Sequence, residues 1–139
     1  MPITKKFAQR LIRTIFAKQD LTLSNNLEIA LYTSAPTLDG GGTEVTGGGY
    51  RRVSIERSGD SFEHVLATAR SYTSNKVKIK FPAATADWGT VTHFGLHSVE
   101  SGTDNLLAYG ELSEAKNIHS GDGGPQFGVD ALKFYLDGR

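Results

Sequence analysis

The chain has 139 residues, of which 38% are hydrophobic, 15 are basic, 15 are acidic and none is cysteine. This length favours a single domain that buries roughly two-thirds of its unfolded surface. The lack of cysteine excludes disulfides and thiolate metal sites. No apolar run approaches the roughly 20 residues of a membrane span, and no signal-peptide pattern opens the chain, so we expect no membrane partner.

The charges are divided unevenly along the chain. Residues 1–19 hold five basic side chains and no acidic one, which leaves ten basic and fifteen acidic side chains for the remainder. Because opposite charges are segregated in this way, we expect two parts. They are a basic docking arm over residues 1–19 and an acidic folded domain over residues 20–139.

The basic arm has the periodicity of an amphipathic helix. Phe7, Leu11 and Ile15 recur every four residues, with further apolar residues beside them. This spacing predicts a helix from Thr4, as N-cap, to about Lys18, with one apolar stripe and a basic surface elsewhere. The helix is expected either to lie on the domain with its basic face in solvent or to dock on an acidic partner. Nucleic acid is disfavoured as a partner because no basic and aromatic surface continues into the acidic domain.

Most of the remaining chain alternates between apolar and polar residues, as half-buried strands do. The clearest segments are residues 27–34, 50–57, 75–81, 90–99 and 105–112, followed by a short pattern at 116–120 and a last strand at 126–137. In the third segment Val77, Ile79 and Phe81 are expected to point inward. In the last, the inward parity changes near Ala131, which predicts a bulge.

Turn signals separate these segments. Residues 37–49 hold two glycine triplets but lack the Lys-Ser/Thr and following helix of a phosphate-binding loop, so a surface loop is expected. A hairpin turn is predicted at residues 100–104, a tight loop at residues 121–125, and a short helical turn at residues 63–69. Seven or eight strands with such spacing predict an all-β fold, a jelly-roll-like antiparallel β-sandwich preceded by the helix.

Trp88 is the single tryptophan, and it lies in the turn before the most regular strand. Pro82 and Gly89 flank this turn, which holds the indole close to the end of the sandwich. We expect the ring to be buried within the fold or at a subunit contact, because aromatic residues dominate such contacts. The alternative is an exposed ring that stacks on a sugar.

Patterns of catalytic or metal-binding residues are lacking in the sequence. His93 and His97 share a strand face but lie about 13 Å apart in an extended chain, too far to chelate one ion. The carboxylates are scattered singly, the Asp-x-Asp spacing of an EF-hand is missing, and no Gly-x-Ser-x-Gly elbow occurs. We therefore expect a protein that is not an enzyme and needs no cofactor or metal.

Several motifs together resemble a known family. LYTSAP, TEVTGGGY, KFPAATADWGTVTHFGL and NLLAYGEL occur in this order, before a Gly-Asp loop and an amphipathic last strand. This series resembles small virion proteins of tailed bacteriophages that are usually labelled tail fibre proteins, over about residues 27–137. The resemblance implies a structural, non-enzymatic protein of the virion, assembled in the host cytoplasm, and it supplies no site residues.

Two functions follow as hypotheses. In the first, the chain is a β-sandwich subunit that assembles on the capsid surface, as a decoration or cement protein, or on the tail or neck. Its partners are then other virion proteins and further copies of itself, in a ring or trimer. In the second, it is a glycan-binding adhesion module that uses Trp88, Tyr50, Tyr72 or Tyr109. The predicted assembly contacts are Lys5, Lys6, Arg10, Arg13 and Trp88.

Overall fold

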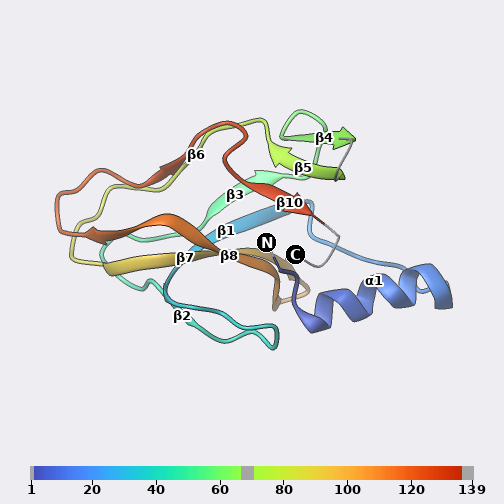
Figure 1. Ribbon diagram of the computed structural model, residues 1–139. Helices are drawn as coiled ribbons and strands as arrows, with labels where there is room; N and C mark the ends of the chain where they lie inside the picture. The colour runs from blue at the N-terminus through green and yellow to red at the C-terminus, as the bar shows by residue number, and fades with distance from the viewer. Residues whose placement is uncertain (1, 67–70, 136–139) are drawn as a thin grey trace.

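The computed structural model describes residues 2–66 and 71–135. These residues form one helix and ten strands, which confirms the antiparallel β-sandwich with an N-terminal helix (Figure 1). The elements are α1 (Lys5–Ala17), β1 (Asn26–Ser34), β2 (Thr43–Glu44), β3 (Val53–Glu56), β4 (Phe62–Leu66), β5 (Ser71–Asn75), β6 (Ile79–Lys80), β7 (Gly89–Glu100), β8 (Thr103–Ile118), β9 (Gln126–Phe127) and β10 (Lys133–Tyr135).

The main sheet contains five strands in the order β2-β1-β7-β8, with β3 also paired to β1. Strands β7 and β8 form its longest ladder and are joined by Ser101 and Gly102, whose φ angles are 50° and 80°. Positive φ at both central residues matches the right-handed twist of a two-residue hairpin, so the predicted turn at residues 100–104 is confirmed. Strands β1 and β7 are each paired on both sides, so they form the interior of the sheet.

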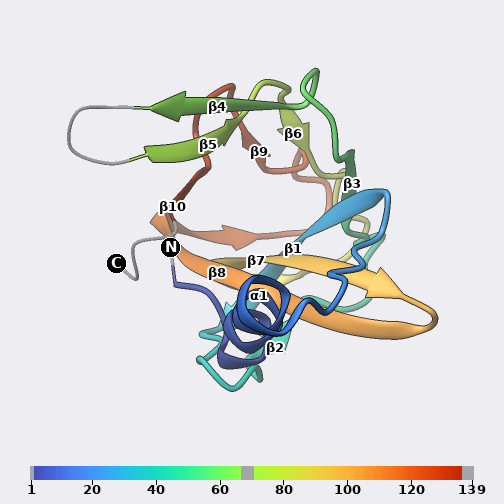
Figure 2. The ribbon, with the colours of Figure 1, turned by 90° about the vertical axis from the view of Figure 1, so that its right-hand side faces the viewer.

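The second layer is made of two smaller ladders, β10-β5-β4 and β6-β9. They lie above the main sheet in Figure 2, whereas α1 lies on the opposite side. Apolar residues from both layers meet between them and form one core. Its largest fully buried apolar side chains are those of Phe81, Ile29, Leu31, Ile79 and Val91. The buried positions at Ile79 and Phe81 confirm two of the three inward residues predicted there, while Val77 is 38% exposed.

The segment predicted as a helical turn at residues 63–69 is a strand as far as the structure describes it. Residues 62–66 form β4, which pairs with β5, and residues 67–70 lie outside the described ranges. Phe62 packs edge-on against Phe134 with 6.5 Å between ring centroids. This tertiary contact, made with a residue 72 positions later in the chain (134 − 62 = 72), overrides a weak local preference for helix.

The predicted last strand, residues 126–137, is divided into β9 and β10, which belong to different ladders. Between them Asp130 has a φ of 65°, and the Ala131 amide donates to the Gly128 carbonyl oxygen. The parity change near Ala131 therefore marks a turn and not a bulge. Short strands such as β6 and β9 raise the number of strands above the predicted seven or eight.

Trp88 is buried inside the fold, with 5% of its surface exposed. Its indole nitrogen donates to the Gly48 carbonyl oxygen at 2.8 Å, and its ring meets Tyr50 edge-on with 5.5 Å between centroids. Gly48 has a φ of 59°, and a Cβ there would lie 2.9 Å from the indole. Only glycine suits this position, which gives the second glycine triplet a structural reason.

We expect Trp88→Ala to lower the free energy of unfolding by about 3–5 kcal/mol, because it removes a large core side chain and leaves a cavity. Urea unfolding followed by circular dichroism measures this, since the variant has no tryptophan to report fluorescence. Val129→Ala is the control: Val129 is 57% exposed, and its truncation should change stability by about 0.5 kcal/mol or less. Equal stability of the two variants would refute a core role for the indole.

Candidate functional site

The N-terminal end of α1 is fixed to the sandwich. Thr4 is the N-cap, as predicted: its hydroxyl accepts a hydrogen bond from the Phe7 amide at 3.3 Å and donates one to the Leu106 carbonyl at 2.8 Å. The Thr4 amide also donates to the Leu107 carbonyl oxygen at 2.9 Å, at the edge of β8. Because Thr4 is only 3% exposed, the helix begins at a fixed point on the body.

Two of the four cations predicted as assembly contacts are engaged within the chain. Lys5 forms an exposed ion pair with Asp39, with 3.2 Å between nitrogen and oxygen. Arg10 reaches Glu100 at 2.8 Å, and 25% of its side chain is exposed. Since Arg10 also donates to the Thr22 carbonyl, it fastens the middle of α1 to the end of β7. Assembly by these two side chains would have to compete with their internal partners.

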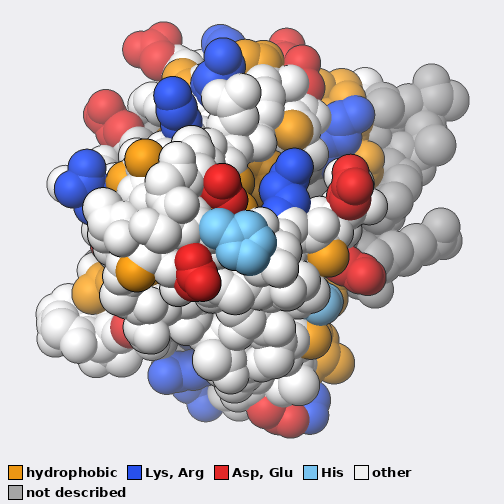
Figure 3. Space-filling model, turned by 90° about the vertical axis from the view of Figure 1, so that its left-hand side faces the viewer, with side chains coloured by type: hydrophobic (Ala, Val, Ile, Leu, Met, Phe, Trp, Pro, Cys, Tyr) orange, Lys and Arg blue, Asp and Glu red, His pale blue; other side chains and the backbone are white. Residues whose placement is uncertain are grey.

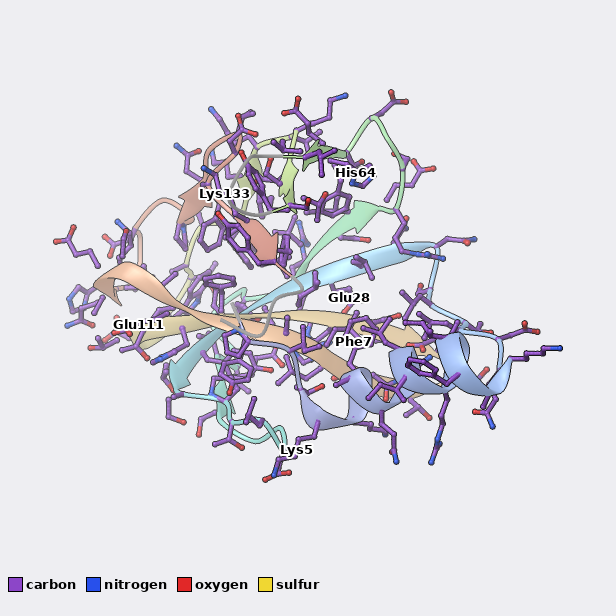
Figure 4. The ribbon with its side chains drawn as sticks, turned by 45° about the vertical axis from the view of Figure 1, so that its right-hand side comes forward. Lys5, Phe7, Glu28, His64, Glu111 and Lys133 are labelled. Carbon is purple, nitrogen blue, oxygen red and sulfur yellow. The ribbon has the colours of Figure 1, made fainter. Side chains whose placement is uncertain are left out.

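The outward side of α1 differs from its inward side. Phe7 points toward the body and packs on the core, whereas Lys5 lies beside the loop that carries Asp39 (Figure 4). Beyond the body edge, Ile12, Ile15 and Phe16 are 56%, 70% and 81% exposed. Large apolar side chains are seldom this exposed side by side unless they bind something. We call these three residues the apolar face of α1.

A groove of about 800 Å³ separates the first half of α1 from the loop that follows β1. Ile12 lines the groove from the helix and Leu38 lines it from the loop, and Leu38 is 43% exposed. The floor belongs to the outer face of the main sheet. It is formed by Tyr32, His97, Asp104, Asn105 and Leu106. The groove thus joins the apolar face of α1 to a polar floor.

One arginine organises the polar residues beneath and beside this floor. Arg52 donates two hydrogen bonds to Glu44, at 2.9 and 2.8 Å, and two to Asp104, at 3.1 and 2.7 Å. A further bond of 3.1 Å reaches Glu28. The guanidinium therefore faces carboxylates from β1, β2 and β8, and only 19% of the Arg52 side chain is exposed.

His97 extends this network into the sheet. Its Nδ1 lies 2.9 Å from Asp104, and its Nε2 lies 2.6 Å from the Tyr32 hydroxyl. Burial, together with the nearby Arg52 charge, lowers the pKa of His97 despite the opposing effect of Asp104. The neutral ring therefore donates from Nδ1 to the carboxylate and accepts the tyrosine proton at Nε2.

The carboxylates of the network are held in their ionised form. Burial alone would raise the pKa values of Glu44 and Asp104, but hydrogen bonds from Arg52 outweigh burial, and both pKa values lie below their ordinary range. Tyr50 adds a second hydrogen bond to Glu44, at 2.7 Å. Glu44 and Asp104 are therefore ionised near neutral pH beside the Arg52 guanidinium.

The hydrogen bonds from Tyr32 to His97 and from His97 to Asp104 are arranged like a proton relay. However, neither Tyr32 nor His97 has a reactive atom that is exposed to a substrate. Burial raises the pKa of Tyr32 to about 12, and the residue is only 4% exposed. Both nitrogens of His97 already have partners. We therefore assign these residues to holding the strands together.

The other histidines lie apart from this network. His64 contacts Thr73, His93 contacts Thr92, and His119 lies 3.8 Å from Asp87. Among residues 2–66 and 71–135, no three His, Asp or Glu side chains gather closely enough to hold a metal ion. The one helix of this part of the chain is too short and polar to cross a membrane.

The sequence did not reveal the Arg52 network because its members lie far apart in the chain. Arg52 and Asp104 are 52 residues apart, and Tyr32 and His97 are 65 apart. Pairing of β1 with β7 brings Glu28 opposite His97. One sequence pattern could have pointed to the network: in β1, Glu28 and Tyr32 alternate with apolar residues, which places both polar side chains on the same face of the strand.

We expect Arg52→Met to destabilise the protein by at least about 2 kcal/mol at pH 7.5, because three carboxylates lose their shared cation. The loss should shrink at pH 4, where protonation removes their repulsion. In the native protein the pKa values of Glu44, Asp104 and His97 are all lowered, so the unfolded chain binds protons more readily than the folded one. The native protein is therefore more stable at neutral pH. It loses this stability as the pH falls, first below about 6.5, where His97 of the unfolded chain becomes protonated, and then through the lower range of the two carboxylates. Urea unfolding at the two pH values measures both effects.

The neighbouring Arg51 supplies the control. It is exposed, so Arg51→Met should leave stability nearly unchanged at both pH values. If Arg52→Met lost as much stability at pH 4 as at pH 7.5, charge would not be the cause and packing of the arginine stem would explain the loss.

Comparison with known proteins identifies the chain at the level of its family. No curated protein matches it. The model of the Gp80 family, described as podophage GP4 fiber I protein gp80, matches residues 2–134. This match confirms the resemblance to tail fibre proteins and extends it to α1 and to residues 58–70, which the resemblance had not covered. With nearly its whole length matched, the chain belongs to the Gp80 family of podophage fibre proteins.

Proposed function

We propose that the chain is a globular subunit of a tail fibre, mounted on the tail or neck of the virion through α1. Its family consists of fibre proteins, which makes the chain a structural protein of a bacteriophage virion. The single observation that carries the finer proposal is the projecting helix. The helix extends past the edge of the sandwich (Figure 1), and its apolar face is exposed.

A globular role fits this chain better than a role in the fibre shaft. A shaft gains length from sequence repeats or heptads, whereas these 139 residues show neither. The two β layers instead close over one core. A fibre that includes this chain would therefore use it as a base, joint or tip, and other chains would supply the length.

The helix suits attachment because no residue of α1 is buried, although the helix is fixed to the body at Thr4 and Arg10. A partner can cover the apolar face without unfolding the core. The opposite end of the molecule shows charged side chains of both signs interspersed with small apolar areas (Figure 3). Such a surface is typical of solvent contact, which favours α1 as the attached end.

Two alternatives are less well supported. A glycan platform built on Trp88 would need an exposed ring, but the indole is packed against Tyr50 and bonded to Gly48. Catalysis would need a reactive atom that is exposed to a substrate, which Tyr32 and His97 do not offer. We accordingly propose a non-enzymatic role, in which several copies assemble in a ring or trimer on the virion.

Immunogold electron microscopy of intact virions tests the position. Antibodies raised against the purified chain should label the tail or neck, because a subunit mounted on a fibre base lies there. A preimmune serum on the same particles is the control. Label spread over the capsid surface would replace the proposal with a decoration or cement role, and unlabelled particles would argue against a place in the mature virion.

A further inference from the structure

The apolar arc of α1 is wider than the surface that the sandwich covers. At 3.6 residues per turn, the apolar residues from Phe7 through Phe16 occupy about half of the helix circumference. Phe7 and Leu11, on one side of the arc, are partly buried against the body. Ile12, Ile15 and Phe16, on the other side, form the exposed apolar face. The chain thus carries a second, unused half of an apolar stripe.

Unpaired cations border this face. Lys6 and Arg13 lie about two turns apart on the helix. Both are exposed, and neither forms an ion pair within residues 2–66 and 71–135. No acidic residue occurs in the first 19 positions. This border differs from the predicted set of contacts, because Lys5 and Arg10 already have the intrachain partners Asp39 and Glu100.

A second copy of α1 is a poor partner for this surface. Two such helices packed face to face would bring together the exposed Lys6 and Arg13 of both copies, with no acidic residue in residues 1–19 of either. Like charges at a packed interface oppose association and select against the wrong partner. The charges of α1 therefore favour a surface that carries the opposite sign.

We propose that the apolar face of α1 binds an amphipathic helix of another virion protein, whose own apolar stripe is bordered by Asp and Glu side chains. This inference rests on the proposed function and names the partner's chemistry. Ile12 and Phe16 are four residues apart, so they form one ridge that fits between side chains of a facing helix. Phe16, the most exposed, is the anchor, while Lys6 and Arg13 face the carboxylates.

The groove beside α1 gives this partner room. Ile12 belongs both to the apolar face and to the lining of the groove, and Leu38 faces it from the loop after β1. A helix lying along the outward side of α1 can therefore place apolar side chains between Ile12 and Leu38. The partner would cover four exposed apolar residues of this chain at one contact: Ile12, Ile15, Phe16 and Leu38.

Photo-crosslinking inside virions tests the partner's identity. The full chain carries benzoylphenylalanine in place of Phe16 and is incorporated during phage growth. Mass spectrometry should then identify a crosslinked peptide from another virion protein, with apolar residues at helical spacing and carboxylates beside them. Crosslinks to a second copy of this chain, or to a peptide without carboxylates, would overturn the inference.

Variants test the contribution of each part. Ile15→Ser with Phe16→Ser should lower incorporation into particles at least about tenfold, the loss expected for an interface anchor. Lys6→Glu with Arg13→Glu should also lower it, and rebinding of wild-type protein to particles grown without it should weaken as salt rises. Val77→Ser with Val129→Ser is the matched control, since these residues are exposed on the body, away from α1.

The outcomes separate the two proposals. If the wild-type chain is incorporated and the α1 variants are incorporated equally well, the proposed function stands and this inference fails. If the wild-type chain is missing from particles, both fail. Unchanged melting temperatures must accompany the loss, because a folding defect would also reduce incorporation. Flotation with phosphatidylglycerol vesicles at 150 mM salt should show no binding, and binding that depends on Phe16 would identify a membrane surface instead.

Discussion

The outer face of the main sheet depends on the ion pairs that the Arg52 guanidinium forms with three carboxylates. The guanidinium meets Glu28, Glu44 and Asp104, which come from β1, β2 and β8. Without it, three carboxylates would lie together over partly buried strands, at a high electrostatic cost. Because one cation serves all three, strand order and local charge are coupled: the sheet must bring these strands together for the carboxylates to be neutralised.

This arrangement also explains how a chain of zero net charge presents a basic element. Part of the body's negative charge is neutralised internally at Arg52, and part is used by Arg10 and Lys5 to hold α1 in place. What remains exposed on the helix is a smaller and more specific set, Lys6 and Arg13 beside apolar side chains. The overall count of charges along the sequence thus overstates the charge available to a partner.

Local patterns predicted the fold class, α1 and the long strands, because each of these is encoded by neighbouring residues. The N-cap at Thr4 and the turn at Ser101 and Gly102 are examples. The β4 strand and the division of the last strand depend on partners distant in sequence, which alternation alone does not specify. The same reason hid the network of Arg52 and the exposure of Phe16, since both are decided by which surfaces meet after folding.

The path of the chain from α1 into the sandwich has a mechanical consequence. After α1 ends at Ala17, the chain runs through residues 18–25 directly into β1, an interior strand of the main sheet. A pull on the helix therefore reaches β1 through the chain, β8 through the hydrogen bonds of Thr4, and β7 through the ion pair of Arg10 with Glu100. A force applied to α1 is thus divided among three neighbouring strands of the main sheet.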